Sequence, residues 1–166
     1  MISNLWILGN SDISIPLAIR KTVFSDDLGL PNNEAPDAFD PQAMHLIVLD
    51  EGKPVATGRV YHDGQTFRIG KCAVLSEMRG KGIGDLLIKL LLLKAFEFNP
   101  SEVRIHAIGH AVGFYKKYGF RETGEPFIED TAEHITMTVT KETLVIPAGC
   151  GEDRGYKDFF KDDKPI

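Results

Sequence analysis

Hydrophobic residues in the first half of the chain fall into short runs separated by turn residues, which is the pattern of β-strands joined by tight turns. Three such runs cover residues 45–49, 55–62 and 66–74. The segments between them contain Asp50-Glu51-Gly52 and Asp63-Gly64, and Asp-Gly between apolar runs favours a β-hairpin. The pattern therefore predicts an antiparallel meander of three strands.

Two elements and a loop are expected before this meander. The apolar run at residues 5–8 suits a short strand, and apolar residues from Pro16 to Phe24 recur at helical spacing. Gly29 is expected to end this helix. Residues 31–41 contain three prolines and are expected to form a loop that covers part of the domain.

The second half of the chain is predicted to alternate between helices and strands. We expect a helix over residues 83–98, a strand over 103–108 and a shorter helix over 111–118. Two closing strands are expected, one from residue 120 onward and one over residues 135–140. The first of these helices is apolar nearly all round, so it should be buried on more than one side, under the sheet or in a homodimer. Because it joins two strands, it should form a βαβ unit with a parallel pair. Together the elements predict an α+β fold with a mixed sheet, antiparallel at the start and parallel across the βαβ unit, and helices on both faces.

Length and charge narrow the possible classes of protein. The 166 residues suffice for one domain, expected over residues 1–146, with a tail over 147–166 that carries Tyr156, Phe159 and Phe160. With 43% hydrophobic and 26% charged residues, the chain has the composition of a globular domain. Its net charge of -5 argues against broad nucleic-acid binding and mildly favours cationic small molecules.

The cysteines and the apolar segments indicate in which cellular compartment the protein is expected. Cys72 and Cys150 lie far apart without metal-finger spacing, so no disulfide framework or zinc site is expected, and a reducing cytoplasm fits best. The N-terminus lacks a basic region and a cleavage site, and Lys89 and Lys94 interrupt the longest apolar stretch. The sequence therefore predicts neither export nor a membrane partner.

A glycine-rich segment opens the long helix. In Arg79-Gly80-Lys81-Gly82-Ile83-Gly84 the glycines allow backbone N–H groups to converge on an anion at a helix N-terminus, as a pyrophosphate would require. A Walker loop is excluded because Asp85-Leu86 follows Gly84, and the glycines do not form GxGxxG. Arg79, Gly82 and Gly84 instead match the coenzyme A loop Arg/Gln-x-x-Gly-x-Gly/Ala. A tight turn without a ligand is the alternative.

A second motif follows at the usual distance. Residues 111–120, Ala-Val-Gly-Phe-Tyr-Lys-Lys-Tyr-Gly-Phe, are similar to the segment Ala-x-x-Phe-Tyr-x-x-x-Gly-Phe of the GNAT family of acetyl-CoA-dependent N-acyltransferases. The chain therefore resembles this family over residues 14–140. Within the family it resembles the ElaA-like subgroup, through Ile19-Arg20-x-x-Val23-Phe24, Ala56-Thr57-Gly58-Arg59-Val60, Gly124-Glu125-x-Phe127 and His134-Ile135-x-Met137.

The resemblance implies a GNAT fold and a set of site residues. Contacts to acetyl-CoA are implied for Cys72, Ala73, Val74, Arg79, Gly80, Lys81, Gly82, Ile83, Gly84, His110, Phe114 and Lys117. In the family fold the strand carrying residues 71–74 splays from its neighbour, and the Val74 N–H is the candidate donor to the thioester oxygen. Tyr115 maps onto the family's general acid, and simple packing beside Phe114 is the alternative.

The implied reaction is transfer of an acetyl group from acetyl-CoA to a primary amine of a small molecule or peptide, by direct attack in a ternary complex. No covalent intermediate is expected, because neither cysteine has an evident histidine partner. A non-catalytic acyl-CoA-binding module is the main alternative, and a structural protein without a cofactor is a third.

The sequence leaves open which group is the general base and what Arg20 and Arg59 bind. The general base is one of several candidates, namely His106, His110, Glu125, Glu129, His134 or a water chain. His110 stands where many relatives carry Asn, and the intervening Gly109 argues against a metal pair between His106 and His110. Arg20 and Arg59 correspond to arginines near the acceptor cleft of the subgroup, where they would bind a carboxylate; a surface ion pair is the alternative.

Overall fold

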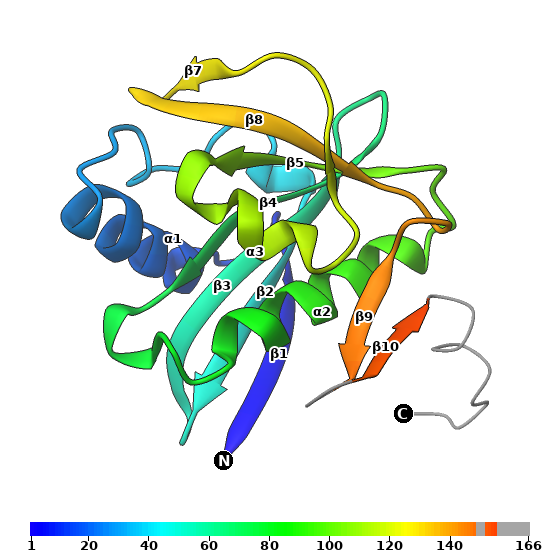
Figure 1. Ribbon diagram of the computed structural model, residues 1–166. Helices are drawn as coiled ribbons and strands as arrows, with labels where there is room; N and C mark the ends of the chain where they lie inside the picture. The colour runs from blue at the N-terminus through cyan, green and yellow to red at the C-terminus, as the bar shows by residue number, and fades with distance from the viewer. Residues whose placement is uncertain (149–151, 156–166) are drawn as a thin grey trace.

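The computed structural model describes residues 1–148 and 152–155 (Figure 1). Its main sheet has the strand order β1-β2-β3-β4-β5-β8-β6, with β7 paired to β8. The strands are β1 (Ile2–Leu8), β2 (Met44–Asp50), β3 (Lys53–His62), β4 (Phe67–Val74), β5 (Val103–Ile108), β6 (Arg121–Glu122), β7 (Phe127–Glu129) and β8 (Ala132–Val139). Among these strands only β4 and β5 pair in parallel, which confirms the predicted mixed sheet.

Helices cover both faces of the sheet. They are α1 (Ser14–Arg20), which continues into the π-helix η1 (Lys21–Asp27), α2 (Ile83–Phe96), α3 (Val112–Lys116) and the 3-10 turns η2 (Asp40–Gln42), η3 (Ser76–Met78) and η4 (Gly109–Ala111). Side chains of β2 alternate between the faces, as the pleat requires. Leu46 and Val48 join the core that includes α2, whereas His45 contacts Arg20 of α1 at 3.3 Å. The helices α1 and α2 therefore lie on opposite faces.

Several element boundaries differ from those expected. The strand β1 begins at Ile2, earlier than expected, because Ser3 and Asn4 also pair with β2. The strand β8 begins at Ala132 because its first residues pair with β7. The helix α2 ends at Phe96, two residues early. A second sheet pairs β9 (Val145–Ala148) with β10 (Glu152–Gly155), across the expected start of the tail at residue 147. The extent of the domain stays a prediction, and Cys150, Tyr156, Phe159 and Phe160 lie outside the described residues.

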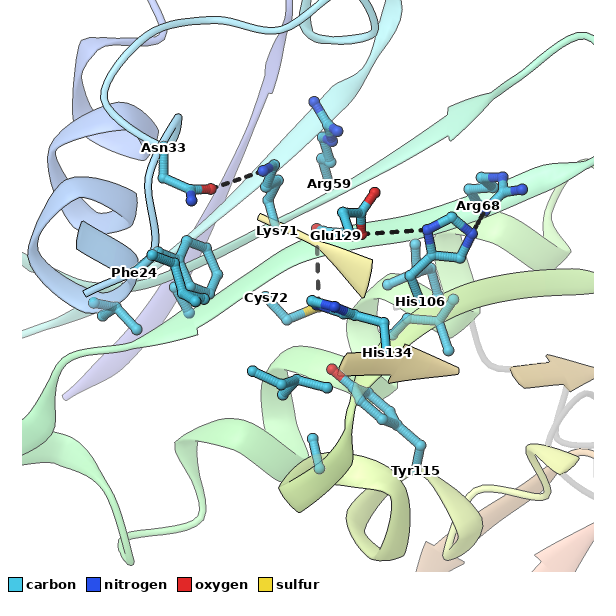
Figure 2. Close-up of a pocket in the computed structure, with 18 of the residues that line it drawn as sticks. Phe24, Asn33, Arg59, Arg68, Lys71, Cys72, His106, Tyr115, Glu129 and His134 are labelled. Carbon is cyan, nitrogen blue, oxygen red and sulfur yellow. Dashed lines mark hydrogen bonds and ion pairs between the residues drawn. The ribbon is translucent and has the colours of Figure 1, made fainter. Parts of the chain in front are cut away.

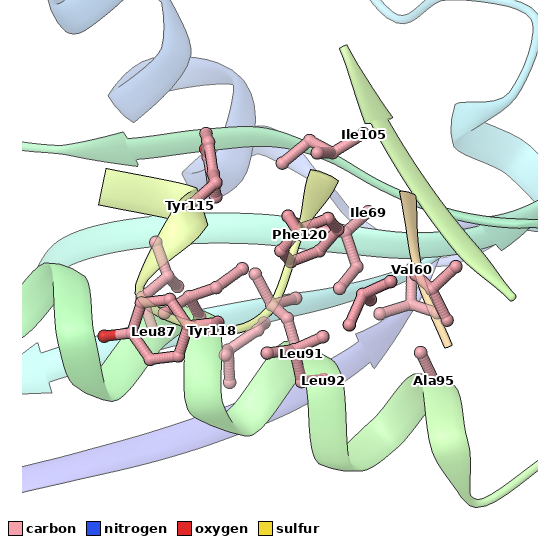
Figure 3. Close-up of a cluster of buried hydrophobic side chains, with 14 of the residues drawn as sticks. Val60, Ile69, Leu87, Leu91, Leu92, Ala95, Ile105, Tyr115, Tyr118 and Phe120 are labelled. Carbon is pink, nitrogen blue, oxygen red and sulfur yellow. The ribbon is translucent and has the colours of Figure 1, made fainter. Parts of the chain in front are cut away.

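The helix α2 packs a broad apolar face into the core of the molecule (Figure 3). Its residues Leu91, Leu92 and Ala95 have no exposed surface, and Tyr118 and Phe120 belong to the same core. The chain turns between these two aromatics at Gly119, whose φ is 86° and whose missing Cβ would lie 1.7 Å from the carbonyl oxygen of Thr143. Packing against the sheet and this covering segment buries much of α2, whereas Leu86, Leu90 and Leu93 on its remaining side are half-buried.

Candidate active site

A cavity of about 850 Å³ opens where β4 and β5 separate. The two strands pair only at Phe67 with Val103 and at Arg68 with Arg104, although β4 continues to Val74. On its other side, β4 shifts register against β3, and Lys71 adopts the left-handed region with a φ of 52°. Such a bulge bends the strand that carries it. The bend removes β4 from β5 and leaves room for a ligand between them.

The residues implied by the family resemblance divide into two groups around this cavity. Those that line it are Cys72, Ala73, Val74, Arg79, Gly84, His110, Phe114 and Tyr115. Gly80, Lys81, Gly82, Ile83 and Lys117 are not among the lining residues. The ammonium of Lys117 instead binds Asp85 at 3.1 Å and lies over the ring of Phe114. This contact joins α3 to the first turn of α2 outside the cavity.

The backbone of β4 presents a donor to the cavity. Leu75 N–H donates to the carbonyl of Val55 in β3 at 3.0 Å. Because successive peptide groups of a strand point in opposite directions, the N–H of Val74 faces the side from which β5 has withdrawn. The geometry of β4 thus suits this amide for binding a carbonyl oxygen.

The N-terminus of α2 is shaped for an anion. Gly80 and Gly82 have φ values of 73° and 78°, and α2 begins without a side-chain cap. Amides in the first turn of a helix have no partner within the helix, and the helix dipole favours negative charge there. Arg79 donates to the carbonyl of Val74 at 3.1 Å and binds Asp27 at 3.2 Å, so it joins the end of β4 to η1. This geometry fits a pyrophosphate group.

Tyr115 and Cys72 face each other inside the cavity. Tyr115 is 8% exposed, and its hydroxyl is within hydrogen-bonding reach of the Cys72 thiol. Burial raises the pKa of Tyr115 well above its ordinary value, and burial raises the pKa of the Cys72 thiol to about 12. Both groups therefore keep their protons near neutral pH. The phenol is a proton donor there, and the thiol is not a nucleophile.

The other end of the cavity gathers polar side chains from three distant segments (Figure 2). They are Asn33 and Asp37 from the loop over residues 31–41, Arg68, Lys71 and His106 from β4 and β5, and Glu129, Asp130 and His134 near the β7–β8 turn. Arg68 can only donate, so its contact with His106 occupies the Nε2 lone pair and places the proton on Nδ1. That nitrogen lies 3.5 Å from Glu129, and this interaction lowers the pKa of the Glu129 carboxyl.

His134 is arranged differently from His106. Its Nδ1 lies 2.9 Å from the carbonyl oxygen of Ala132, which can only accept, so Nδ1 carries the proton and Nε2 keeps a lone pair. Within the described part of the chain, no hydrogen-bond partner is found for that Nε2. Glu125 is not among the lining residues, whereas His110 lies by the glycine-rich segment, at the other end of the cavity. Among the predicted bases, His134 alone combines a place at the polar end with a free imidazole lone pair.

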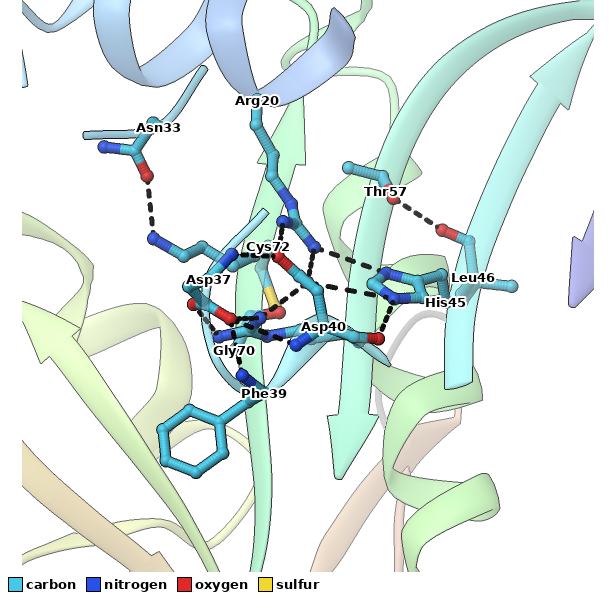
Figure 4. A network of polar contacts seen from close by, with 12 residues as sticks. Arg20, Asn33, Asp37, Phe39, Asp40, His45, Leu46, Thr57, Gly70 and Cys72 are labelled. Carbon is cyan, nitrogen blue, oxygen red and sulfur yellow. Dashed lines mark hydrogen bonds and ion pairs between the residues drawn. The ribbon is translucent and has the colours of Figure 1, made fainter. Parts of the chain in front are cut away.

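The structure corrects the interpretation of Arg20 and Arg59. Figure 4 shows Arg20 paired with Asp40. The two arginine side chains are 1% and 3% exposed and share Asp40, at 2.8 Å and 2.6 Å, so their ion pairs are buried and not on the surface. Arg59 lines the cavity, but its terminal nitrogens are held by Asp37 and Asp40. Neither arginine is free to bind an acceptor carboxylate, because the loop over residues 31–41 folds back over the sheet and supplies the counter-ions.

No motif in the sequence marked some residues at the polar end of the cavity as site residues. Lys71 and Asn33 are 38 residues apart and belong to no motif, yet Lys71 Nζ donates to Asn33 Oδ1 at 2.7 Å.

In residues 1–148 and 152–155, no group of three His, Cys, Asp or Glu side chains is placed to hold a metal ion. No helix of the described chain is long and apolar enough to cross a membrane.

Comparison with known proteins identifies the class. The chain belongs to the GNAT acetyltransferase family, since the family profile described as "Acetyltransferase (GNAT) domain" matches residues 28–141, and it is therefore an acyltransferase. It is 30% identical over 120 residues to the uncharacterized N-acetyltransferase YjcF of Bacillus subtilis. The alignment covers 72% of this chain and 86% of that protein.

Solved structures share the fold. Escherichia coli ElaA superimposes with a TM-score of 0.74 at 24% identity, over 83% of this chain and 99% of that one. A GNAT family acetyltransferase from Elizabethkingia anophelis, solved with acetyl-CoA bound, gives a TM-score of 0.65 at 22% identity, over 84% and 97% of the two chains.

Proposed function

We propose that this protein transfers an acetyl group from acetyl-CoA to a primary amine of a small molecule or peptide, by direct attack of the amine in a ternary complex. The observation that carries the proposal is the separation of β4 from β5, which opens one cavity to Val74, Tyr115 and His134. Acetyl-CoA supplies the activated carbonyl of a thioester.

Binding is assigned to the backbone around the start of α2. The free amides after Gly82 and the helix dipole hold the pyrophosphate. The guanidinium of Arg79, at the end of β4, adds a positive charge on the rim of the cavity. Backbone groups of β4 that face the cavity take the hydrogen bonds of the pantetheine arm. Acetyl-CoA is thus bound largely by the main chain and the helix dipole.

Each proton transfer has a candidate group. His134 Nε2 accepts a proton from the acceptor amine as the new C–N bond forms. The Val74 N–H donates to the carbonyl oxygen while that oxygen carries negative charge. The Tyr115 hydroxyl gives its proton to the departing sulfur as the C–S bond breaks. Cys72 takes no part as a nucleophile, because its thiol stays protonated.

The test combines binding with turnover. Thermal unfolding is followed with acetyl-CoA and CoA, with ATP and NAD as controls, and release of CoA is then measured with a panel of amines. At 100 times its Kd a ligand adds about 2.7 kcal/mol of stability. Stabilisation by the CoA compounds with amine-dependent release of CoA supports the proposal. Stabilisation without release from any amine supports the non-catalytic binding module, and no stabilisation in folded protein rejects both.

A further inference from the structure

One cation of the cavity has no anionic partner. The other three are each paired with a carboxylate: Arg59 with Asp37, Arg68 with Asp63 and Arg79 with Asp27. Lys71 instead donates to the neutral amide oxygen of Asn33. Among the described residues, no carboxylate oxygen lies within ion-pair distance of its ammonium. Asp37, Asp130 and Glu129, which also line the cavity, act on Lys71 only through space.

The amide that meets Lys71 is fixed in orientation. Asn33 is 3% exposed, and its Nδ2 donates to the carbonyl of Pro31 at 2.7 Å. The amide oxygen therefore faces the ammonium, and one of the three donors of Lys71 is used. The ammonium also lies 5.9 Å from the centre of the Phe24 ring. Among the described residues its other two donors have no hydrogen-bond acceptor, so they can meet a ligand in the cavity, which Lys71 lines.

The arrangement of Lys71 costs free energy. Burial lowers the pKa of its ammonium, and the backbone holds a φ of 52° that residues other than glycine rarely adopt. A half-buried charge beside a neutral group is unfavourable unless a counter-ion is supplied. Strain of this kind is retained where it positions a functional group. An anionic ligand would supply the missing counter-ion.

We propose that Lys71, held in place by Asn33, binds a carboxylate of the acceptor, so that the acceptors are amino acids and other amino carboxylates. This inference rests on the proposed function and names its substrate class. The carboxylate accepts hydrogen bonds from the free donors of Lys71, which lies on β4 three residues from Val74. Glu129 and Asp130 line the same end of the cavity and attract the amino group.

The test uses matched acceptors that differ only in charge. Unbranched amino acids with one to five methylenes between the amine and the carboxyl group are compared with their carboxamides in wild type and Lys71→Met. We expect wild type to show a kcat/KM at least 10-fold higher for the preferred acid than for its amide. In Lys71→Met this ratio falls to about one. In Lys53→Met, which removes an exposed lysine of β3, the ratio stays that of wild type.

A second variant tests the same contact without removing the cation. Asn33→Asp places an internal carboxylate beside Lys71, which competes with that of the acceptor. We expect it also to lower the ratio of acid to amide, in protein whose thermal unfolding confirms folding. Equal losses for acids and amides in Lys71→Met would assign Lys71 another role and overturn the inference.

A binding measurement separates this inference from the proposed function. Thermal unfolding in the presence of CoA is compared for N-acetyl amino acids and their amides. Greater stabilisation by the acids, lost in Lys71→Met, supports the carboxylate site even where turnover is slow. Equal stabilisation of wild type by acids and amides, or acetylation of amines without preference for acids, overturns the inference alone. Failure of acetyl-CoA to bind or to yield CoA with any amine rejects the proposed function.

Discussion

The side chain of Tyr115 shows how burial sets the chemistry of one residue. Its phenol faces a thiol and has a raised pKa, so it holds a proton throughout the physiological range. We expect Tyr115→Phe to lower kcat by about 10²-fold, the lower end of the range for general acid catalysis. The Kd of acetyl-CoA should change by less than about 2-fold, because the phenylalanine retains the packing. Turnover and calorimetric binding measure the two effects, and unchanged turnover would leave Tyr115 with a packing role only.

His134 is distinguished from the other histidines by the atom that it leaves free. We expect His134→Gln to lower kcat/KM for the acceptor by about 10²-fold near neutral pH. His62→Gln, in an exposed position on β3, is the matched control. A His134→Gln variant with the wild-type kcat/KM would point to Glu129 or water as the base.

The start of α2 is the element to which we assign the binding of acetyl-CoA. Gly82→Ala forces a side chain into a φ of 78°, which we expect to cost about 1–2 kcal/mol. Its Cβ would enter the open space in front of the helix N-terminus, and acetyl-CoA should bind at least 10-fold more weakly. Gly52→Ala has nearly the same φ, 75°, in a hairpin remote from the cavity. It should lose similar stability by chemical denaturation and keep the wild-type affinity; equal affinities in both variants would remove the glycine-rich segment from the site.

The loop over residues 31–41 is held on the sheet by buried charge. Asp40 lies between Arg20 and Arg59, so Asp40→Asn leaves the buried Arg20 without a counter-ion and Arg59 with Asp37 alone. We expect a loss of about 3–5 kcal/mol in the free energy of unfolding. Asp26→Asn, which breaks the exposed pair with Lys21, should cost less than about 1 kcal/mol. Urea denaturation measures both, and similar values would show that burial of the network contributes little.

The same network gives the whole molecule a pH dependence of stability. Burial lowers the pKa of His45 from 6.5, so below that pH the unfolded chain binds a proton that the folded chain does not. Burial alone would raise the pKa of Asp40, but Arg20 and Arg59 hold it far below 3.8. Stability therefore falls with acid, first below about pH 6.5 and again below about pH 4. His45→Gln should show a shallower loss between pH 7 and 5 in urea titrations, and an unchanged slope would contradict this account.

The sequence by itself determined the elements whose signals are local. Strand alternation and Asp-Gly turns located the meander, and the glycine spacing and the segment over residues 111–120 located the two motifs around the cavity. Even the all-round apolar pattern of α2 correctly indicated burial on more than one side. These features depend on neighbours a few residues away, because helices, strands and turns are specified by short periods and by the conformational freedom of single glycines.

Only the tertiary structure decided which partners the charged groups have. Arg20 and Arg59 were expected in a cleft or on the surface, and the loop that carries Asp40 buries them. Lys71 faces Asn33 because a bulge in β4 turns one strand toward a loop 38 residues away in the sequence. The protonation and freedom of an ionisable side chain depend on burial and on contacts between distant segments. Register and loop packing fix those contacts, and no local pattern of residues encodes them.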